Sequence, residues 1–307
     1  MREISANGNY KYVFSTYDEP IARVSTGEEI TFFTEDAFAG TVQSPADLPT
    51  KCRTKWVNPQ VGPIYIEGAE PGDTLAIHIL DIQPGREYGW SCMAKNFGGI
   101  VASANTPMLN SPLDEKVWIY KYEDGMLVDS LNKDLIFHWN PFMGTIATAP
   151  EKEAIRSDYP FEQGGNMDVP DVKPGNILYL PVSVEGAYFF TGDCHGKQGH
   201  GEICGAAIEF AARPTLKFEL IKGKKIKQPR IESPDELMCV GSERPMEDAA
   251  RSAYIGLLEW MVELGWDKVE AYQCLSQEVE MYVGNIVNPR YSMVAKLKKE
   301  IAYRCKK

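Results

Sequence analysis

The chain of 307 residues is 44% hydrophobic and 24% charged, which is typical of a folded globular protein and excludes a largely disordered one. Its formal net charge of −11 argues against a nucleic-acid partner, because binding a phosphate backbone needs a concentrated basic surface. Seven scattered cysteines, with no apolar segment typical of export or bilayer insertion, predict a reduced cytoplasmic protein without a membrane partner.

Strand and turn signals dominate the first two thirds of the chain. Two turns, at residues 70–73 and 173–176, place Pro and then Gly at their centre, which is the pattern of type II turns. Short β-branched or aromatic runs between Gly, Pro and Asp predict strands at residues 30–33, 64–66, 74–80, 117–122, 177–184 and 215–220.

Helical patterns begin after Ser233. Residues 245–264 carry apolar side chains at helical spacing, and Gly265 is expected to end that helix. Asp267 is expected to cap a second helix that ends near residue 275, and a strand at 281–283 and a Lys-rich helical tail follow. We therefore predict an α+β, β-rich fold: an antiparallel or mixed β-sandwich or barrel-like body with C-terminal helices. The body would span residues 1–232, and a helical region of residues 233–307 would pack on it as part of one functional unit.

Metal-ligand side chains gather around a Gly-rich turn at residues 196–199. If this turn closes a β-hairpin, His195 lies opposite His200, and Asp193 lies opposite Glu202. Because side chains alternate along a strand, all four then share one face, with opposed Cβ atoms about 4.5–5.5 Å apart. Such a cluster suits a divalent metal or a hydrolytic site of carboxylates and imidazoles. The other interpretation is a solvated hairpin tip.

Cys194 lies between Asp193 and His195, which raises the question of a thiolate nucleophile. In a regular strand its side chain points to the face opposite both neighbours, away from the cluster. The chain also lacks the Gly-x-Ser-x-Gly and Ser-x-x-Lys motifs of serine catalysis. The sequence therefore favours an activated water over a side-chain nucleophile.

Four stretches, in order, carry a resemblance to a known family: residues 58–73 (NPQVGPIYIEGAEPGD), 140–150 (NPFMGTIATAP), 164–168 (GGNMD) and the turn region 192–202. Through them the chain resembles the acetamidase/formamidase family of amide hydrolases over nearly its whole length. The resemblance implies hydrolysis of small linear amides, such as formamide or acetamide, to a carboxylate and ammonia. It also implies a homo-oligomer.

The turn region departs from the family's usual Gly-Asp-Gly-His-Ala-Ala-Gln-Gly-Asp-Gly-Glu. Cys194, Gly196, Lys197 and His200 replace four of those residues. An imidazole in place of a carboxylate removes a negative charge and favours zinc over calcium, which prefers oxygen ligands. Substrate and metal preference are therefore left open by the resemblance.

Hydrolysis of an amide needs an attacking water, stabilisation of the oxyanion and an acid for the leaving amine, and a divalent metal supplies the first two. The predicted metal ligands are Asp193, His195, His200 and, more loosely, Asp36. The predicted catalytic residues are Glu202, as general base or additional ligand, with Asp168, Asn166 and Glu67. Competing structural interpretations are turn-backbone partners for Asn166 and Asp168, a turn cap for Glu67 and a loop acid for Asp36.

Two alternatives to linear-amide hydrolysis remain on the sequence alone. A related enzyme would act on another C–N bond, such as that of a lactam or an imide. A non-catalytic protein would use a structural metal to hold the hairpin together.

Overall fold

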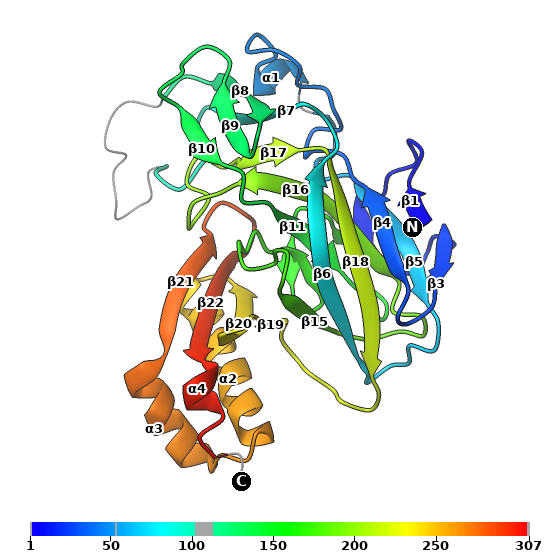
Figure 1. Ribbon diagram of the computed structural model, residues 1–307, viewed down its shortest axis with the longest axis vertical. Helices are drawn as coiled ribbons and strands as arrows, with labels where there is room; N and C mark the ends of the chain where they lie inside the picture. The colour runs from blue at the N-terminus through cyan, green and yellow to red at the C-terminus, as the bar shows by residue number, and fades with distance from the viewer. Residues whose placement is uncertain (1, 53, 102–112, 306–307) are drawn as a thin grey trace.

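A computed structural model describes residues 2–52, 54–101 and 113–305 of the chain. Two large open sheets form a sandwich-like, β-rich body, as Figure 1 shows. Helices α2 (Met246–Glu263), α3 (Lys268–Glu278) and α4 (Lys299–Ala302) gather at one end of the molecule, and the short α1 (Pro49–Cys52) lies at the other. The predicted β-rich α+β class is confirmed, as a sandwich and not as a closed barrel.

The first sheet has nine strands and runs through both the body and the C-terminal region. Its order is β1 (Arg2–Ser5), β4 (Glu29–Phe33), β18 (Ala212–Ile221), β6 (Thr74–Pro84), β15 (Ile177–Pro181), β19 (Arg230–Glu232), β20 (Glu236–Glu243), β22 (Tyr291–Lys298) and β21 (Glu280–Asn285). Among the described strands of this sheet, only β1 and β4 pair in parallel.

The second sheet has eleven strands and carries the turn region singled out in the sequence. Its main path is β10 (Ile136–His138), β9 (Met126–Asp129), β8 (Lys116–Glu123), β7 (Tyr88–Met93), β17 (Ile208–Phe210), β16 (Phe189–Lys197), β11 (Phe142–Ala147), β14 (Gly164–Asn166) and β13 (Pro160–Phe161). Two strands lie off this path, β5 (Gln60–Ile66) on β16 and β3 (Ala22–Val24) on β5. A separate pair joins β2 (Val13–Phe14) and β12 (Ile155–Arg156).

Both predicted type II turns are present and precede neighbouring strands. The amide N–H of Asp73 donates to Glu70 O at 3.0 Å, and that of Asn176 donates to Lys173 O at 3.1 Å. Gly72 and Gly175 have φ of 95° and 90°, which a side chain would disfavour. The strands that follow, β6 and β15, pair antiparallel, so the two turns start adjacent strands of the first sheet.

The main hydrophobic core lies between the two sheets. Phe189 of β16 meets Phe32 and Phe218 of the first sheet at ring-centroid distances of 6.0 and 4.9 Å. Cys194 of β16 joins the same core. Phe189 and Cys194 can both face this core because the pairing of β16 with β5 shifts register between Phe189 and Thr191. Alternation next to Cys194 then turns Asp193 and His195 toward the opposite side of β16.

The C-terminal region is partly as predicted. Helix α2 ends before Gly265, and Asp267 caps α3 by accepting from the amides of Val269 and Glu270. The prediction of a Lys-rich helical tail is wrong over residues 291–298, which form β22. In the described part of the tail, which ends at residue 305, only α4 is helical. Side chains of β22 are buried on both faces, Val294 in the main core and Leu297 under the helices. A strand between two layers can bury both of its faces in this way, whereas a surface helix buries only one.

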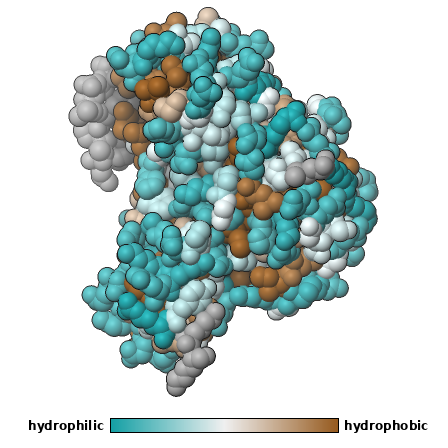
Figure 2. All heavy atoms as spheres, viewed as in Figure 1, coloured by the Kyte–Doolittle hydropathy of each residue, from teal (hydrophilic) through white to brown (hydrophobic). Residues whose placement is uncertain are grey.

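The proposed division between residues 232 and 233 stays a prediction, although β19 and β20 pair directly across it. In the part of the chain that the structure describes, no helix has the length and apolar character to cross a membrane. Figure 2 shows a mostly hydrophilic face with smaller hydrophobic patches on the β-rich body.

Candidate active site

The turn region does not close the predicted two-strand hairpin. Strand β16 continues to Lys197 and pairs with β17, so that His195 lies opposite Glu209 and not opposite His200. Residues 198–207 connect the two strands, because Gly201 (φ 90°) and Glu202 (φ 49°) turn the backbone away from a regular ladder.

His200 and Glu202 consequently separate. The His200 side chain is exposed, and its ring stacks on that of Tyr282 at a centroid distance of 4.3 Å. Glu202 is buried and belongs to a group with His195 and Glu209. His200 therefore lies outside the cluster of acids that the turn region helps to build.

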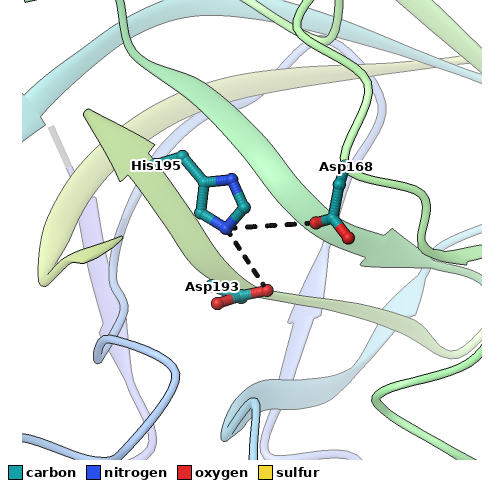
Figure 3. Close-up of side chains that lie close together, drawn as sticks. All are labelled: Asp168, Asp193 and His195. Carbon is teal, nitrogen blue, oxygen red and sulfur yellow. Dashed lines mark ion pairs between the residues drawn. The ribbon is translucent and has the colours of Figure 1, made fainter. Parts of the chain in front are cut away.

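The cluster centres on one nitrogen atom. His195 Nε2 lies 3.5 Å from Glu209 Oε2, 3.7 Å from Asp193 Oδ2 and 3.9 Å from Asp168 Oδ1. Figure 3 shows Asp168 and Asp193 directed at this nitrogen from two chain segments. With Glu202, four buried carboxylates surround one imidazole.

A network of amides and a hydroxyl fixes the acids. Asn58 Nδ2 donates to Asp193 Oδ2 and to Asn166 Oδ1, both at 2.8 Å, and Thr145 Oγ1 donates to Asp193 Oδ2 at 2.9 Å. Asn288 Nδ2 donates to Asp168 Oδ2. Since each bond restricts one carboxylate rotamer, the oxygens near His195 are held in place before any ligand binds.

Gln198 sets the orientation of the His195 ring. Its amide nitrogen donates to the carbonyl oxygens of Asp168 at 2.9 Å and Gly284 at 3.0 Å, which leaves its amide oxygen 2.9 Å from His195 Nδ1. Because an amide oxygen only accepts, Nδ1 carries the proton. Nε2 therefore presents either a lone pair or a second proton to the carboxylates, the arrangement found at metal-ligating histidines.

Burial and mutual repulsion perturb the acids of the cluster. Burial, with the nearby Asp193 carboxylate, raises the pKa of Glu202 to about 8. Burial and neighbouring carboxylates raise the pKa of both Asp168 and Glu209 well above the usual range. Burial also opposes the ionisation of Asp193, but the adjacent His195 keeps the pKa of this carboxyl below its usual value. The cluster is thus arranged to bind protons or a cation.

The residues present fit a divalent metal ion. Asp168, Asp193 and His195 form one possible ligand group, and His195, Glu202 and Glu209 form another. Three carboxylate oxygens, Asp168 Oδ1, Asp193 Oδ1 and Glu209 Oε2, find no hydrogen-bond donor among the described residues. A Cβ on Gly144 would lie 2.8 Å from His195 Nε2 and 2.9 Å from Asp168 Oδ1, so glycine keeps this space free.

A cavity of about 620 Å³ ends at the cluster. Aromatic side chains and the amides of the network form part of its wall, which includes Phe38, Asn58, Trp90, Phe97, Asn166 and Asn288. The amide nitrogen of Asn166 donates to no described residue. This nitrogen is therefore free to bind a ligand in the cavity.

Two predicted site residues lie elsewhere. Asp36 is buried, but its carboxylate accepts from Arg86 at 2.9 Å and from the backbone N–H groups of Phe38 and Gly40. Glu67 is exposed and pairs with Arg23 at 3.2 Å. Neither belongs to the possible metal-ligand groups in the described chain. Asp36 instead supports the loop that carries Phe38 into the cavity wall.

Glu209 is the main residue that the sequence reasoning missed. It is an acid between the buried apolar residues Ile208 and Phe210, and such a charge is rare in a buried strand without a partner. That signal was available in the sequence. The partner of Glu209 could not be found from the sequence, because the pairing of Glu209 with His195 depends on how β17 joins the sheet.

The family model described as acetamidase/formamidase matches residues 18–158 and 151–302. The acetamidase of Mycolicibacterium smegmatis is 30% identical over 220 residues, which cover 53% of this chain and 53% of that protein. The formamidase of Methylophilus methylotrophus is 29% identical over 208 residues, covering 52% and 51%. The chain thus spans about half the length of the curated relatives it matches.

Solved structures agree over a longer range. The acetamidase of Yersinia enterocolitica is 39% identical with a TM-score of 0.92, covering 98% of this chain and 92% of that one. The acetamidase of Bacillus halodurans is 30% identical with a TM-score of 0.90, covering 99% of both chains. Because the family model matches most of the length of this chain, the chain belongs to the acetamidase/formamidase family.

Proposed function

We propose that this protein hydrolyses linear amides to a carboxylate and ammonia. The observation that carries the proposal is the burial of one imidazole among four carboxylates at the end of a substrate-sized cavity. Membership of a family whose matched relatives are named acetamidase and formamidase supports the same reaction. Perturbed acids in a cavity are the usual mark of a catalytic site.

We propose that Asp168, Asp193 and His195 hold a divalent metal ion, with zinc favoured over calcium. When bound, such an ion lowers the pKa of water from 15.7 toward about 7 and polarises a carbonyl group. His195 Nε2 at the centre of the group supports zinc, because calcium prefers an all-oxygen shell. The preference rests on one histidine, since His200 lies outside the group.

The remaining residues of the site supply orientation and proton transfer. Asn166 Nδ2 is positioned to donate to the substrate's carbonyl oxygen as charge develops there. Glu202 acts in its ionised form, which predominates above its raised pKa of about 8. In that form it accepts a proton from the attacking water and delivers it to the amide nitrogen, so that the C–N bond breaks and ammonia leaves. Glu209, opposite His195, adds a further carboxyl group beside the ligand group. The roles of Asp36 and Glu67 are structural in this scheme.

The test is ammonia release from formamide, acetamide, a lactam and an imide, with metal content measured in the same preparation. We expect release from the linear amides, loss on chelation, and recovery with zinc but not with calcium. His195→Ala should lose both metal and activity. A folded protein that binds metal but releases no ammonia from any of these compounds would support a structural metal instead.

Assembly and location stay predictions of the family resemblance and composition. We propose a homo-oligomer, and light scattering of the purified protein measures its mass against the 34.4 kDa chain. The proposed cytoplasmic location is tested by fractionation of the source cells.

A further inference from the structure

The cavity is larger than a small amide requires. Acetamide has four non-hydrogen atoms, whereas the cavity of about 620 Å³ lies within the range of roughly 300–1,000 Å³ that accommodates drug-sized ligands. An amide group bound at the acid cluster therefore leaves most of the space to the rest of the substrate.

Apolar and aromatic side chains line the part of the cavity beyond the cluster. Phe38 and Trp90 pack together with ring centroids 4.7 Å apart, and Phe97 and Val287 also contribute to the wall. Trp90 is buried and comes from β7, so this part of the wall belongs to the sheet. It matches an apolar chain or ring between the two ends of a substrate.

Two cations without carboxylate partners line the same cavity. Lys95 and Arg244 are both exposed, in contrast to the buried acids, and therefore lie toward the open end. Neither forms an ion pair with a described residue, although Arg244 lies over the Tyr291 ring at 4.2 Å. Arg156, which also lines the cavity, is already neutralised by Asp158 at 2.9 Å.

The charges along the cavity are therefore segregated. Four carboxylates lie at the closed end, and two unpaired cations lie near the opening of a protein whose net charge is −11. A substrate that matches this pattern presents a neutral amide to the cluster and a negative group to the opening. Its two ends must be well separated, since the exposed Lys95 and Arg244 lie toward the opening and the buried acid cluster lies at the closed end.

We propose that the preferred substrate is the monoamide of a dicarboxylic acid, with an apolar spacer between its amide and its carboxylate. The amide binds at the cluster, the spacer lies along Trp90 and Phe38, and the carboxylate pairs with Arg244 and Lys95. This inference rests on the proposed amide hydrolysis and names its substrate class.

The test compares the monoamide of adipic acid with its uncharged methyl ester, by ammonia release from the metal-replete protein at low ionic strength. We expect kcat/KM to be about 10-fold higher for the acid, mainly through KM, and the difference to shrink at high salt as the charges are screened. Oxamate, whose carboxylate adjoins its amide, cannot reach the two cations from the cluster, so its rate should not exceed that of its methyl ester.

Variants assign the effect to named side chains. Arg244→Gln and Lys95→Gln should each lower the acid-to-ester ratio of kcat/KM about 5-fold. Lys133→Gln removes the same charge from an exposed turn outside the described cavities and should leave the ratio as in the parent protein. An acid-to-ester ratio near one, with acetamide still hydrolysed, overturns this inference and leaves amide hydrolysis standing. Failure with every amide overturns the proposed function itself.

Discussion

Residues 193–195 of β16 show that side-chain directions within one strand can be predicted from the sequence. Alternation along a strand predicts that Cys194 points away from Asp193 and His195, and its side chain indeed packs in the main core. Burial raises the pKa of the Cys194 thiol to about 12, so it is unsuited to act as a thiolate. The direction of these side chains was predictable because it depends only on their own strand.

Gly144 is the residue whose lack of a side chain matters most to the site. Gly144→Ala would place a methyl group 2.8 Å from His195 Nε2 and 2.9 Å from Asp168 Oδ1. Because a misplacement of about 1 Å in a catalytic site can cost 100-fold in rate, we expect at least about that loss of kcat/KM for acetamide. Metal content, measured by elemental analysis, should fall with it.

The matched control is Gly199→Ala. An added Cβ at Gly199 meets no atom within 4 Å, and the residue has no left-handed backbone conformation. It should keep both its metal and its rate. Full activity and metal content in Gly144→Ala would show that the space between Asp168 and His195 is not used.

At the scale of elements, strands were predictable and their partners were not. Residues 74–80 and 215–220 lie within β6 and β18, because an apolar alternation is a property of one segment. The partner of His195 depends on a register set by distant residues, since β17 joins β16 only after a connection of ten residues, 198–207. A Gly-rich turn that resembled a hairpin therefore led to the wrong partner.

The observed register predicts that the two histidines of the turn region respond differently to substitution. His200→Ala should retain metal and amide hydrolysis within about 2-fold, since His200 is exposed, stacks on the ring of Tyr282 and lies outside the possible ligand groups of the described chain. Its loss should cost about 1 kcal/mol of stability or less. The measurements are zinc content, ammonia release and urea unfolding. Metal loss in His200→Ala would restore the hairpin interpretation.

Across the whole molecule, the first sheet separates two cores. Met238 and Val240 of β20 face the main core, whereas Leu237 and Cys239 face α2. The helical periodicity of α2 was visible in the sequence, but the sheet that it covers was not, because α2 and α3 separate β20 from β21 and β22 along the chain. The helices are thus anchored to the same sheet whose other face packs against the active-site sheet.

A partly buried ion pair between Arg230 and Glu263 connects the helical layer to this sheet. Arg230 of β19, with 4% of its side chain exposed, donates through two nitrogens to Glu263 of α2 at 2.8 and 2.7 Å. Glu263 is about one third exposed, which moderates the energy of the pair. Glu263→Gln leaves Arg230 buried without its charge partner, and we expect a loss of about 2 kcal/mol in the free energy of unfolding at pH 7.

The pH dependence of that loss follows from the direction of the pKa shift. Burial alone would raise the pKa of Glu263, but Arg230 and Lys224 hold the pKa of this carboxyl below its usual 4.5. A lowered pKa in the folded state means that the carboxylate stabilises the protein above pH 4.5 and ceases to do so as the pH falls through its folded pKa. Urea unfolding of the parent and Glu263→Gln should therefore differ at pH 7, and the difference should be smaller at pH 3. Glu259→Gln, an exposed change one turn earlier on α2, should match the parent at both values, and a pH-independent difference for Glu263→Gln would contradict the ion-pair account.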